Sequence, residues 1–433
     1  MADRTAAKPL SDYIDLQRGN TYKSALLGQP GPVLLGLASI ARNGGFRGDN
    51  LKTYGGPSDE RMLLAPGEIY VSLKDVTQSA DLLGAVARVP GTISLGRLTQ
   101  DTVKLVFKEA DAPRDYIYWL LRTPQYRAYC RAHATGTTNL GLPREDFLAF
   151  EVPPPSKERE TLLTLLEALD GKIELNRRMN ETLEAMGRAI FKDWFVDFGP
   201  TRAKAQGHPP YLAPDLWSLF PDALDDEGKP VGWQVGSIGD LADTNHQSWT
   251  ARNHPPFVEY IDLSNAKWGN VEAITTLAWE EAPSRARRIA KAGDTIVGTT
   301  RPGNGSFAYI AQDGLTVSTG FAVLSPRQPI YRDVVHSAAT RPDSIERLAN
   351  LADGHGGAYP AVKPSEVSDI ELVLPADAIL TAFAEVLSPI RAKIESAKVE
   401  SRSLAQTRDL LLPRLMSGEI RLSEAEKTVE AVA

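Results

Sequence analysis

The chain has 433 residues, of which 42% are apolar and 24% charged, proportions that suit a soluble globular protein of two to four domains. Its N-terminus lacks the apolar core of a signal peptide, and no window approaches the roughly 18 consecutive apolar residues of a membrane span. A single cysteine, Cys130, excludes an internal disulfide, so the sequence predicts a cytoplasmic protein. The net charge of -7 argues mildly against a nucleic-acid binder, although an average does not exclude local basic patches.

Residues 1–154 are predicted to form a first domain that is strand-rich but mixed, because short β-branched runs are broken by Gly, Pro, Asn and Asp. Its longest apolar run, "PVLLGLASIA", predicts a buried strand. The stretch "ARNGGFRGDNLKTY" (41–54) places basic and amide side chains beside a Gly-Gly pair. Side chains of these types contact phosphates and base edges. The candidate contacts of this domain are Arg42, Asn43, Arg47, Lys52 and Lys74.

A long helix is predicted over 155–198, because its apolar residues recur in steps that alternate between four and three. This spacing is the a/d register of a coiled coil, held for about five heptads. A lone helix of that length cannot bury such a stripe on itself. The predicted seam consists of Leu162, Leu166, Leu169, Ile173, Asn176, Asn180, Leu183, Gly187, Ile190 and Trp194.

A Pro-rich linker over 199–230 leads to a second domain, predicted over 231–374. In this domain "RARRIAK" (285–291) suggests phosphate contacts, with one solvated face as the alternative. In "TTRPGNGSFAY" (299–309) an arginine precedes a loop with little side-chain bulk, where Arg can fork onto guanine and Asn suits adenine. The candidates here are Arg285, Arg287, Arg288, Arg301, Asn304 and Lys363.

A second long helix, predicted over 375–418, repeats the first, since adding 221 to each seam number keeps the register. Segments outside the helices repeat as well: 136–155 parallels 356–375, and 35–73 parallels 261–299. Arg408 is the one charged residue on the second seam, and residues 419–433 are predicted to form a flexible tail. The other positions of that seam are Phe383, Leu387, Ile390, Ile394, Ala397, Ser401, Leu404, Leu411 and Leu415.

Two like helices separated by a returning domain can cover each other as an antiparallel pair, in which facing residue numbers sum to about 577. Leu162 would then face Leu415, and Trp194 would face Phe383. The alternative is that each helix packs only on its own domain. About 38 helical residues span roughly 55–60 Å. Two similar domains on such a spacer would suit a split DNA site, because equivalent major-groove faces recur about every 34 Å.

The sequence resembles the specificity subunits of type I restriction–modification systems over nearly its whole length. The most specific segments are "NETLEAMGRAIFKDWFVDFGP" (180–200), "PDALDDEGKPVGW" (221–233) and "TRDLLLPRLMSGEI" (407–420). The resemblance implies an α+β fold in which two strand-rich target-recognition domains are joined by two helices in an antiparallel coiled coil. It implies that each domain reads one half of a bipartite, asymmetric double-stranded DNA site.

The resemblance also implies partners and a division of chemistry. The helices would dock two methyltransferase (M) subunits that transfer methyl from S-adenosylmethionine to adenine N6, and restriction (R) subunits that use ATP and Mg would join that core. This chain would hold no cofactor, no metal and no catalytic residue. Consistently, it has neither a G-x-x-x-x-G-K-[ST] loop nor a G-x-G-x-x-G motif after a strand.

Two other classes of protein remain as alternatives: a self-contained DNA methyltransferase or nuclease, and a coiled-coil scaffold without DNA binding. "NHPPF" (253–257) resembles an adenine methyltransferase motif, but His254 stands where that motif needs Asn, Asp or Ser. "PDALDDEGK" (221–229) superficially suggests a nuclease, but its spacing predicts an acidic loop. The six scattered histidines do not predict a zinc site. For Arg408, Trp194, Phe195 and Phe198, partner docking and packing within the chain are both open.

Overall fold

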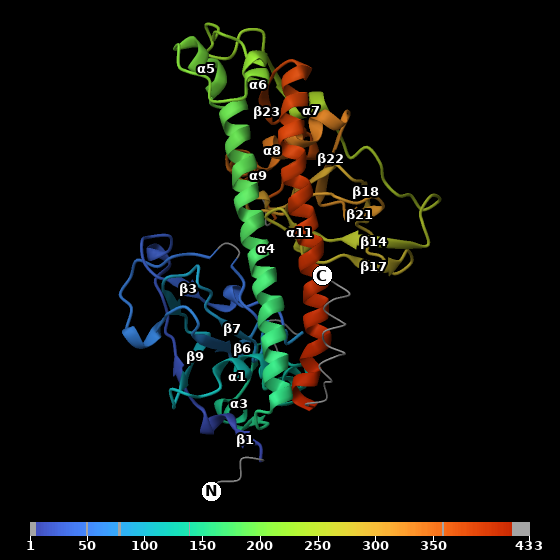
Figure 1. Ribbon diagram of the computed structural model, residues 1–433. Helices are drawn as coiled ribbons and strands as arrows, with labels where there is room; N and C mark the ends of the chain where they lie inside the picture. The colour runs from blue at the N-terminus through green and yellow to red at the C-terminus, as the bar shows by residue number, and fades with distance from the viewer. Residues whose placement is uncertain (1–5, 49–50, 77–78, 138, 357–358, 418–433) are drawn as a thin grey trace. The chain divides into compact units, whose positions relative to one another are not determined.

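The computed structural model describes residues 6–48, 51–76, 79–137, 139–356 and 359–417. It divides into two compact units (Figure 1). The N-terminal unit comprises Met1–Leu175 with Glu400–Ala433, and the central unit comprises Asn176–Val399. The division passes through the two longest helices, α4 (Lys157–Phe195) and α11 (Asp377–Ser417), so each unit holds one end of both. The predicted tail, 419–433, lies outside the described residues.

The N-terminal unit is built on a four-stranded antiparallel sheet in the order β2-β9-β5-β7 and a three-stranded sheet in the order β3-β8-β4, in which β3 and β8 are parallel. Alternate side chains of β5 enter two cores, because successive strand residues point to opposite faces. Ile69 and Val71 pack with α1, α2 and the long helices, whereas Tyr70 packs with the smaller sheet. The strands are β1 (Lys8–Pro9), β2 (Ile14–Arg18), β3 (Val33–Leu35), β4 (Leu63–Leu64), β5 (Ile69–Ser72), β6 (Lys74–Asp75), β7 (Val86–Arg88), β8 (Gly96–Leu98), β9 (Thr102–Phe107), β10 (Leu140–Gly141) and β11 (Glu151–Val152); the short helices are α1 (Arg114–Leu120), α2 (Pro124–Ala132) and α3 (Arg144–Ala149).

The central unit repeats this topology. Its antiparallel sheet has the order β13-β22-β19-β20, and its second sheet, β17-β14-β21-β18, again contains one parallel pair, β14 with β21. Ile296 and Val297 of β19 enter opposite cores, as the residues of β5 do. The strands are β12 (Gln234–Ser237), β13 (Ala242–Thr244), β14 (Phe257–Ile261), β15 (Ala266–Lys267), β16 (Asn270–Val271), β17 (Thr275–Ala278), β18 (Ala286–Ala290), β19 (Thr295–Gly298), β20 (Phe307–Tyr309), β21 (Leu315–Ser318), β22 (Phe321–Pro326) and β23 (Glu371–Leu374); the short helices are α5 (Gly199–Ala205), α6 (Pro214–Leu219), α7 (Ile238–Leu241), α8 (Arg332–Thr340), α9 (Pro342–Gly354) and α10 (Pro364–Ser368).

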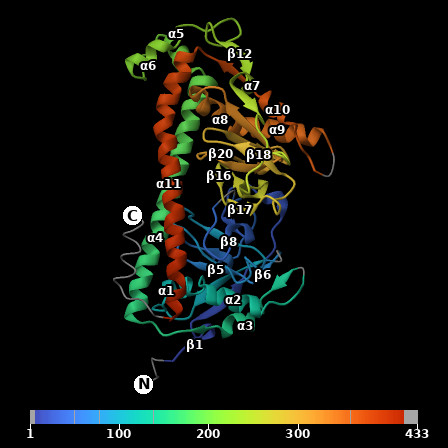
Figure 2. The same cartoon turned by 90° about the vertical axis from the view of Figure 1, so that its right-hand side faces the viewer.

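The two long helices run antiparallel, as the repeat predicts. In the N-terminal unit, Leu162 near the start of α4 shares a core with Leu415 near the end of α11. In the central unit the opposite ends meet. Trp194 near the end of α4 and Phe383 near the start of α11 have ring centroids 5.8 Å apart. The helices lie side by side in both views (Figures 1 and 2). The same cores include residues of each unit's sheets, so the helices cover each other and also pack on their own domains.

Each long helix is tied to its own domain by an ion pair, and the polarity is reversed between the repeats. Asp170 of α4 accepts from Arg122 Nη1 at 3.2 Å. The position 221 residues later is Arg391 of α11, whose Nε lies 2.6 Å from Asp333 Oδ1 at the start of α8. Both pairs are largely buried. The two domains are therefore alike in topology but fastened to their helices by opposite charges.

The fold corrects one local prediction. The run "PVLLGLASIA" is not one strand, because β3 ends at Leu35 and a 3-10 turn follows over Leu37–Ser39. Ser39 stabilises this turn through both its N–H and its hydroxyl, which donate to Gly36 O at 3.0 and 2.7 Å. Among the described residues, no helix has the length and apolar character that a membrane crossing requires.

Candidate nucleic-acid interface

The glycine-containing loop of the first domain is explained by packing. Asn43 has a left-handed backbone (φ 61°), and its N–H donates to Asp81 O at 2.9 Å. Gly44 and Gly45 also have positive φ and lie against Arg122, so a Cβ on Gly44 would come within 3.2 Å of the Arg122 side chain. The positive φ angles of both residues, together with the close approach at Gly44, account for the glycine pair without DNA. Around it, the side chains of Arg42 and Lys52 are exposed and that of Arg47 is half-buried.

Lys74 lies where the loop after β5 meets the segment before α3. Here β6 pairs with β10 in a short antiparallel ladder, in which Lys74 pairs with Gly141. The N–H of Leu142 donates to Leu73 O at 2.9 Å. Lys74 Nζ is 3.5 Å from Asp101 Oδ1, and its side chain is 53% exposed, so this ion pair is long and solvated. The position leaves the Lys74 charge accessible to an anion.

Sequence reasoning missed two arginines that the fold brings beside Lys74. Arg18 at the end of β2 and Arg144 at the start of α3 line the same pocket of about 410 Å³ as Lys74. Arg18 Nε donates to Gln100 O at 3.2 Å, and Arg144 Nη2 donates to Leu16 O at 3.4 Å. These residues are 56 and 70 positions from Lys74 (74 − 18 and 144 − 74), so no local motif links them.

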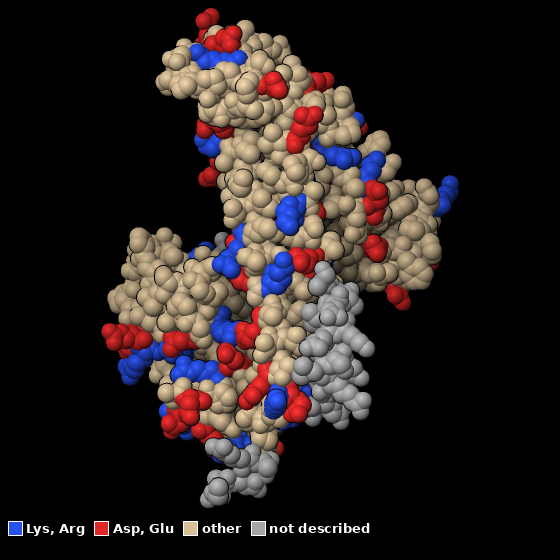
Figure 3. All heavy atoms as spheres, in the orientation of Figure 1, with Lys and Arg blue, Asp and Glu red and all other residues tan. Residues whose placement is uncertain are grey.

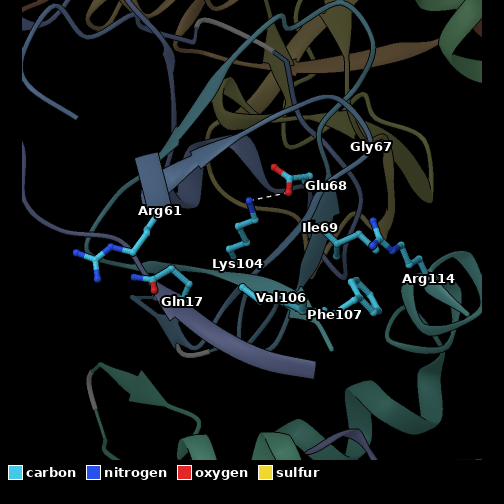
Figure 4. Close-up of a pocket in the computed structure, with 10 residues that line it drawn as sticks. Gln17, Arg61, Gly67, Glu68, Ile69, Lys104, Val106, Phe107 and Arg114 are labelled. Carbon is cyan, nitrogen blue, oxygen red and sulfur yellow. Dashed lines mark ion pairs between the residues drawn. The ribbon is translucent and has the colours of Figure 1, made fainter. Parts of the chain in front are cut away.

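A second pocket of the same unit, of about 460 Å³, is a weaker candidate because its cations are engaged (Figure 4). Lys104 Nζ lies 2.6 Å from Glu68 Oε1, and Figure 4 draws this ion pair. Arg61 pairs with Asp59 at 2.8 Å, and Arg114 lies over the Phe107 ring at 5.2 Å. These contacts neutralise or cover much of the positive charge around the pocket.

The basic stretch of the second domain is likewise engaged. Arg285 pairs with Asp262, and the Arg288 Nη1 donates to Asn245 Oδ1 at 2.7 Å. Arg287 lies over the Trp279 ring at 4.2 Å. All but the first and last residues of the stretch form β18 (Ala286–Ala290), so its alternation is largely that of a sheet strand. The structure thus gives each of these arginines a partner within the chain.

Arg301 occupies a strained position in the second domain. Its φ is 46°, a left-handed conformation that a non-glycine residue adopts at a cost, and its N–H donates to Pro360 O at 2.8 Å. The Arg301 guanidinium carbon lies 5.5 Å from the ring centroid of Tyr359, whose side chain is 75% exposed. Asn304 and Lys363 are also exposed. Gly305, by contrast, is required by packing, because a Cβ there would lie 2.4 Å from Trp268.

Lys74 and Arg301 occupy corresponding ladders of the two domains. In the second domain Thr300 pairs with Ala361, and the N–H of Val362 donates to Thr299 O at 2.9 Å. The first domain has the same arrangement, with Lys74 paired to Gly141. In each, the loop after a central strand, β5 or β19, is held against the segment before a short helix, α3 or α10. We call these two ladders the strand-end loops.

The predicted seam positions are mostly buried. Half-buried exceptions are Ile173, Asn180, Leu183, Ile190, Ile390, Ser401 and Arg408. Arg408 donates to Asp170 Oδ1 at 2.8 Å, and Trp194 and Phe195 lie in the core of the central unit with Phe198 packed against it. The structure therefore places these residues in packing within the chain, not on a free docking surface.

The two segments that resemble catalytic motifs, 253–257 and 221–229, make packing and ion-pair contacts within the chain. His254 stacks on Trp279 with ring centroids 4.1 Å apart. The acidic loop is closed by Lys229, which lies 2.6 Å from Glu227 Oε2 and also contacts Asp225. Among the described residues no group of three or more His, Cys, Asp or Glu side chains could hold a metal ion.

The charges on the face drawn in Figure 3 are mixed. Lys and Arg side chains alternate with Asp and Glu over both units on this face, and no broad single-sign patch interrupts them. Attraction of a polyanion to such a surface depends on small local groups of cations. Arg18, Lys74 and Arg144 form a group of this kind in the first domain.

The chain is similar to known proteins in sequence and in fold. It is 24% identical over 331 residues to the type I restriction enzyme MjaIX specificity subunit of Methanocaldococcus jannaschii, covering 72% of this chain and 70% of that protein. It is 27% identical over 324 residues to the type I restriction enzyme HindI specificity subunit of Haemophilus influenzae, covering 62% of this chain and 68% of that protein. The crystal structure of a type I restriction-modification system S subunit from M. genitalium covers 95% of both chains with a TM-score of 0.50 and 13% identity, which supports a common fold. No protein-family model matches the chain.

Proposed function

We propose that this chain, a relative of the type I restriction enzyme specificity subunits, is the DNA-recognition subunit of a type I restriction–modification complex. The observation that carries the proposal is the recurrence of one backbone arrangement, the strand-end loop, with a cation in each domain. A chain with two such loops has two equivalent places at which to contact DNA. Because their side chains differ, the two domains would read different sequences.

Recognition would combine two kinds of contact. Lys74 and Lys363 would bind phosphates, which position a protein on the duplex without reading its sequence. Arg301 would donate its two parallel N–H groups to guanine O6 and N7, and Asn304 would pair with adenine in the major groove. The strained backbone of Arg301 supports this role, because such strain is retained where a side chain must be aimed.

The site would be bipartite and asymmetric, with the gap between its halves set by α4 and α11. The 39 residues of α4 correspond to roughly 58 Å of helix. An antiparallel pair of such helices resists bending more than either helix alone, so the tolerated gap would be narrow.

Catalysis would belong to partner subunits. Two adenine-N6 methyltransferase subunits would dock on this chain, and restriction subunits would join through them. S-adenosylmethionine, ATP and Mg would be bound by those partners. Binding of radiolabelled S-adenosylmethionine by this chain alone would contradict this division and favour a self-contained methyltransferase.

Methylome sequencing tests the proposal directly. Cells that express the modification subunits would be compared with and without this chain. We expect N6-methyladenine at one split motif only when the chain is present. Methylation that does not depend on the chain, or a single uninterrupted motif, would overturn the proposal.

A further inference from the structure

We infer that the pocket lined by Arg18, Lys74 and Arg144 holds one backbone phosphate of the DNA bound by the first domain. The inference rests on the proposed function, and it assigns to this pocket a ligand class, the phosphodiester. Two of its three cations, Arg18 and Arg144, come from strand and helix ends far from Lys74 in sequence.

The charge of the pocket suits a phosphodiester. Among the described residues, its lining contains three cations and one carboxylate, that of Asp101, so the formal charge of these groups is +3 − 1 = +2. A phosphodiester carries one negative charge, which the pocket can balance. The second pocket has the same formal charge among the described residues, but its Lys104 Nζ lies 2.6 Å from Glu68 Oε1, whereas Lys74 Nζ lies 3.5 Å from Asp101 Oδ1. The lysine charge is therefore more closely compensated in the second pocket.

The arginines of the pocket also keep hydrogen-bond donors for a ligand. Arg18 and Arg144 each make one backbone hydrogen bond from the pocket wall, at 3.2 and 3.4 Å. A guanidinium carries five N–H donors, so these contacts orient each arginine and leave further donors for an anion. Among the described residues, the Lys74 ammonium lies 3.5 Å from Asp101 Oδ1, which is long for an ion pair. The walls thus position cations without neutralising them.

The position of the pocket supports a phosphate contact. It lies at the strand-end loop of the first domain, and the corresponding loop of the second domain carries Arg301. Arg18, which precedes this loop in the sequence, is the last residue of β2, and Arg144, which follows it, is the first residue of α3. A phosphate held there would fix the register of the duplex against the loop, which is how backbone contacts position a protein on DNA.

The test measures DNA binding of the assembled complex by fluorescence anisotropy as a function of salt. Arg18→Ala and Arg144→Ala are each compared on the methylated motif and on a random duplex. Loss of one phosphate contact lowers the slope of log K against log salt by about 0.9, which corresponds to about fivefold weaker binding at 0.15 M salt. We expect this loss on both duplexes, with an unchanged methylated motif. Asp101→Asn should strengthen binding, because it removes a carboxylate from the lining of the pocket.

The matched controls are Arg61→Ala and Arg114→Ala, which remove arginines from the neighbouring pocket. If the Arg18 and Arg144 variants have the same affinity and salt slope as these controls, the inference is overturned. The proposed function still stands in that case, provided that the wild type methylates a split motif. A change of methylated motif would make the pocket a base-reading site and would also overturn the inference. If the wild type methylates no split motif but the variants still weaken binding to a random duplex, the proposed function fails and the phosphate site stands. Absence of any duplex binding overturns both.

Discussion

The Nη1 of Arg408 lies 2.8 Å from Oδ1 of Asp170, and the other oxygen of that carboxylate accepts from Arg122 at 3.2 Å. One carboxylate on α4 therefore joins α11 and the first domain. The charged residue on the second seam is explained by this bridge, because the ion pair places its guanidinium beside an acid on the opposite helix. Arg408 is 16% exposed and Asp170 is 27% exposed, so water screens the pair only partly.

Asp170→Asn should lower the free energy of unfolding by about 3 kcal/mol at pH 7, since it removes the carboxylate that two largely buried guanidinium groups share. Urea denaturation followed by circular dichroism measures the change. Asp409→Asn is the control, because Asp409 also contacts Arg408 but is 61% exposed, and it should cost less than about 1 kcal/mol. Equal effects of the two variants would contradict the bridging role of Asp170.

The difference in stability between wild type and Asp170→Asn should depend on pH in the acid range. Burial raises the pKa of Asp170, but the charges of Arg122 and Arg408 outweigh it and lower the pKa below the usual value. The stabilisation by this carboxylate is therefore complete above the unfolded pKa of about 3.9 and is lost as pH falls through the lower folded pKa. The difference between wild type and Asp170→Asn should be constant from pH 7 to about 5 and shrink below about 4. A difference that shrinks already near pH 6 would contradict this assignment.

Asn180→Leu should raise the stability by about 1 kcal/mol. The Asn180 Oδ1 is buried and has no hydrogen-bond partner among the described residues, and an unsatisfied buried acceptor is costly. Leucine is close in size and a better helix former. Asn176→Leu is the matched control, because Asn176 is buried but not without a partner, so no gain is expected there. Thermal unfolding of both variants is the measurement, and a destabilised Asn180→Leu protein would contradict the prediction.

Arg301→Ala should weaken DNA binding and relax one base position in one half-site only. The loss of a bidentate contact to guanine corresponds to about 1–3 kcal/mol of discrimination. Methylome sequencing reads the relaxed position. Arg301→Lys separates the two kinds of contact, since lysine keeps the charge but loses the fork. Arg327→Ala, which removes an exposed arginine of the same unit, is the control and should leave the motif unchanged. A uniform loss of affinity on every sequence would make Arg301 a phosphate contact.

Removal of one heptad from both long helices should change the gap between the half-sites and leave the half-sites themselves unchanged. Deleting 171–177 with 400–406 preserves the seam register and removes the Lys172–Glu400 pair as a whole. Seven residues correspond to about 10 Å of helix, or about three base pairs at 3.4 Å per step. Deleting 171–177 alone is the control, because it leaves one helix a heptad shorter than its partner. The facing pairs at the two ends of the helices then cannot all form, and assembly should be abolished. An unchanged gap in the double deletion would show that the helices do not set it.

The sequence alone determined the repeated plan and the long helices. Heptad spacing is local information, because residues three and four apart lie on one helix face whatever the rest of the chain does. The shared offset of the two seams then implied a pair, and Trp194 does lie against Phe383. The repeat outside the helices was readable for a similar reason, since matching turns and alternations predict matching strands.

Only the tertiary structure decided which basic side chains have partners within the chain and which lie together in space. Arg285, Arg287 and Arg288 looked like a basic patch, yet each has a partner within the chain. Arg18 and Arg144 carried no sequence signal, yet they line one pocket with Lys74. The physical reason is that such convergence depends on strand register and on the angles at which loops leave the sheet. Those are set by long-range packing, and no spacing along the chain encodes them.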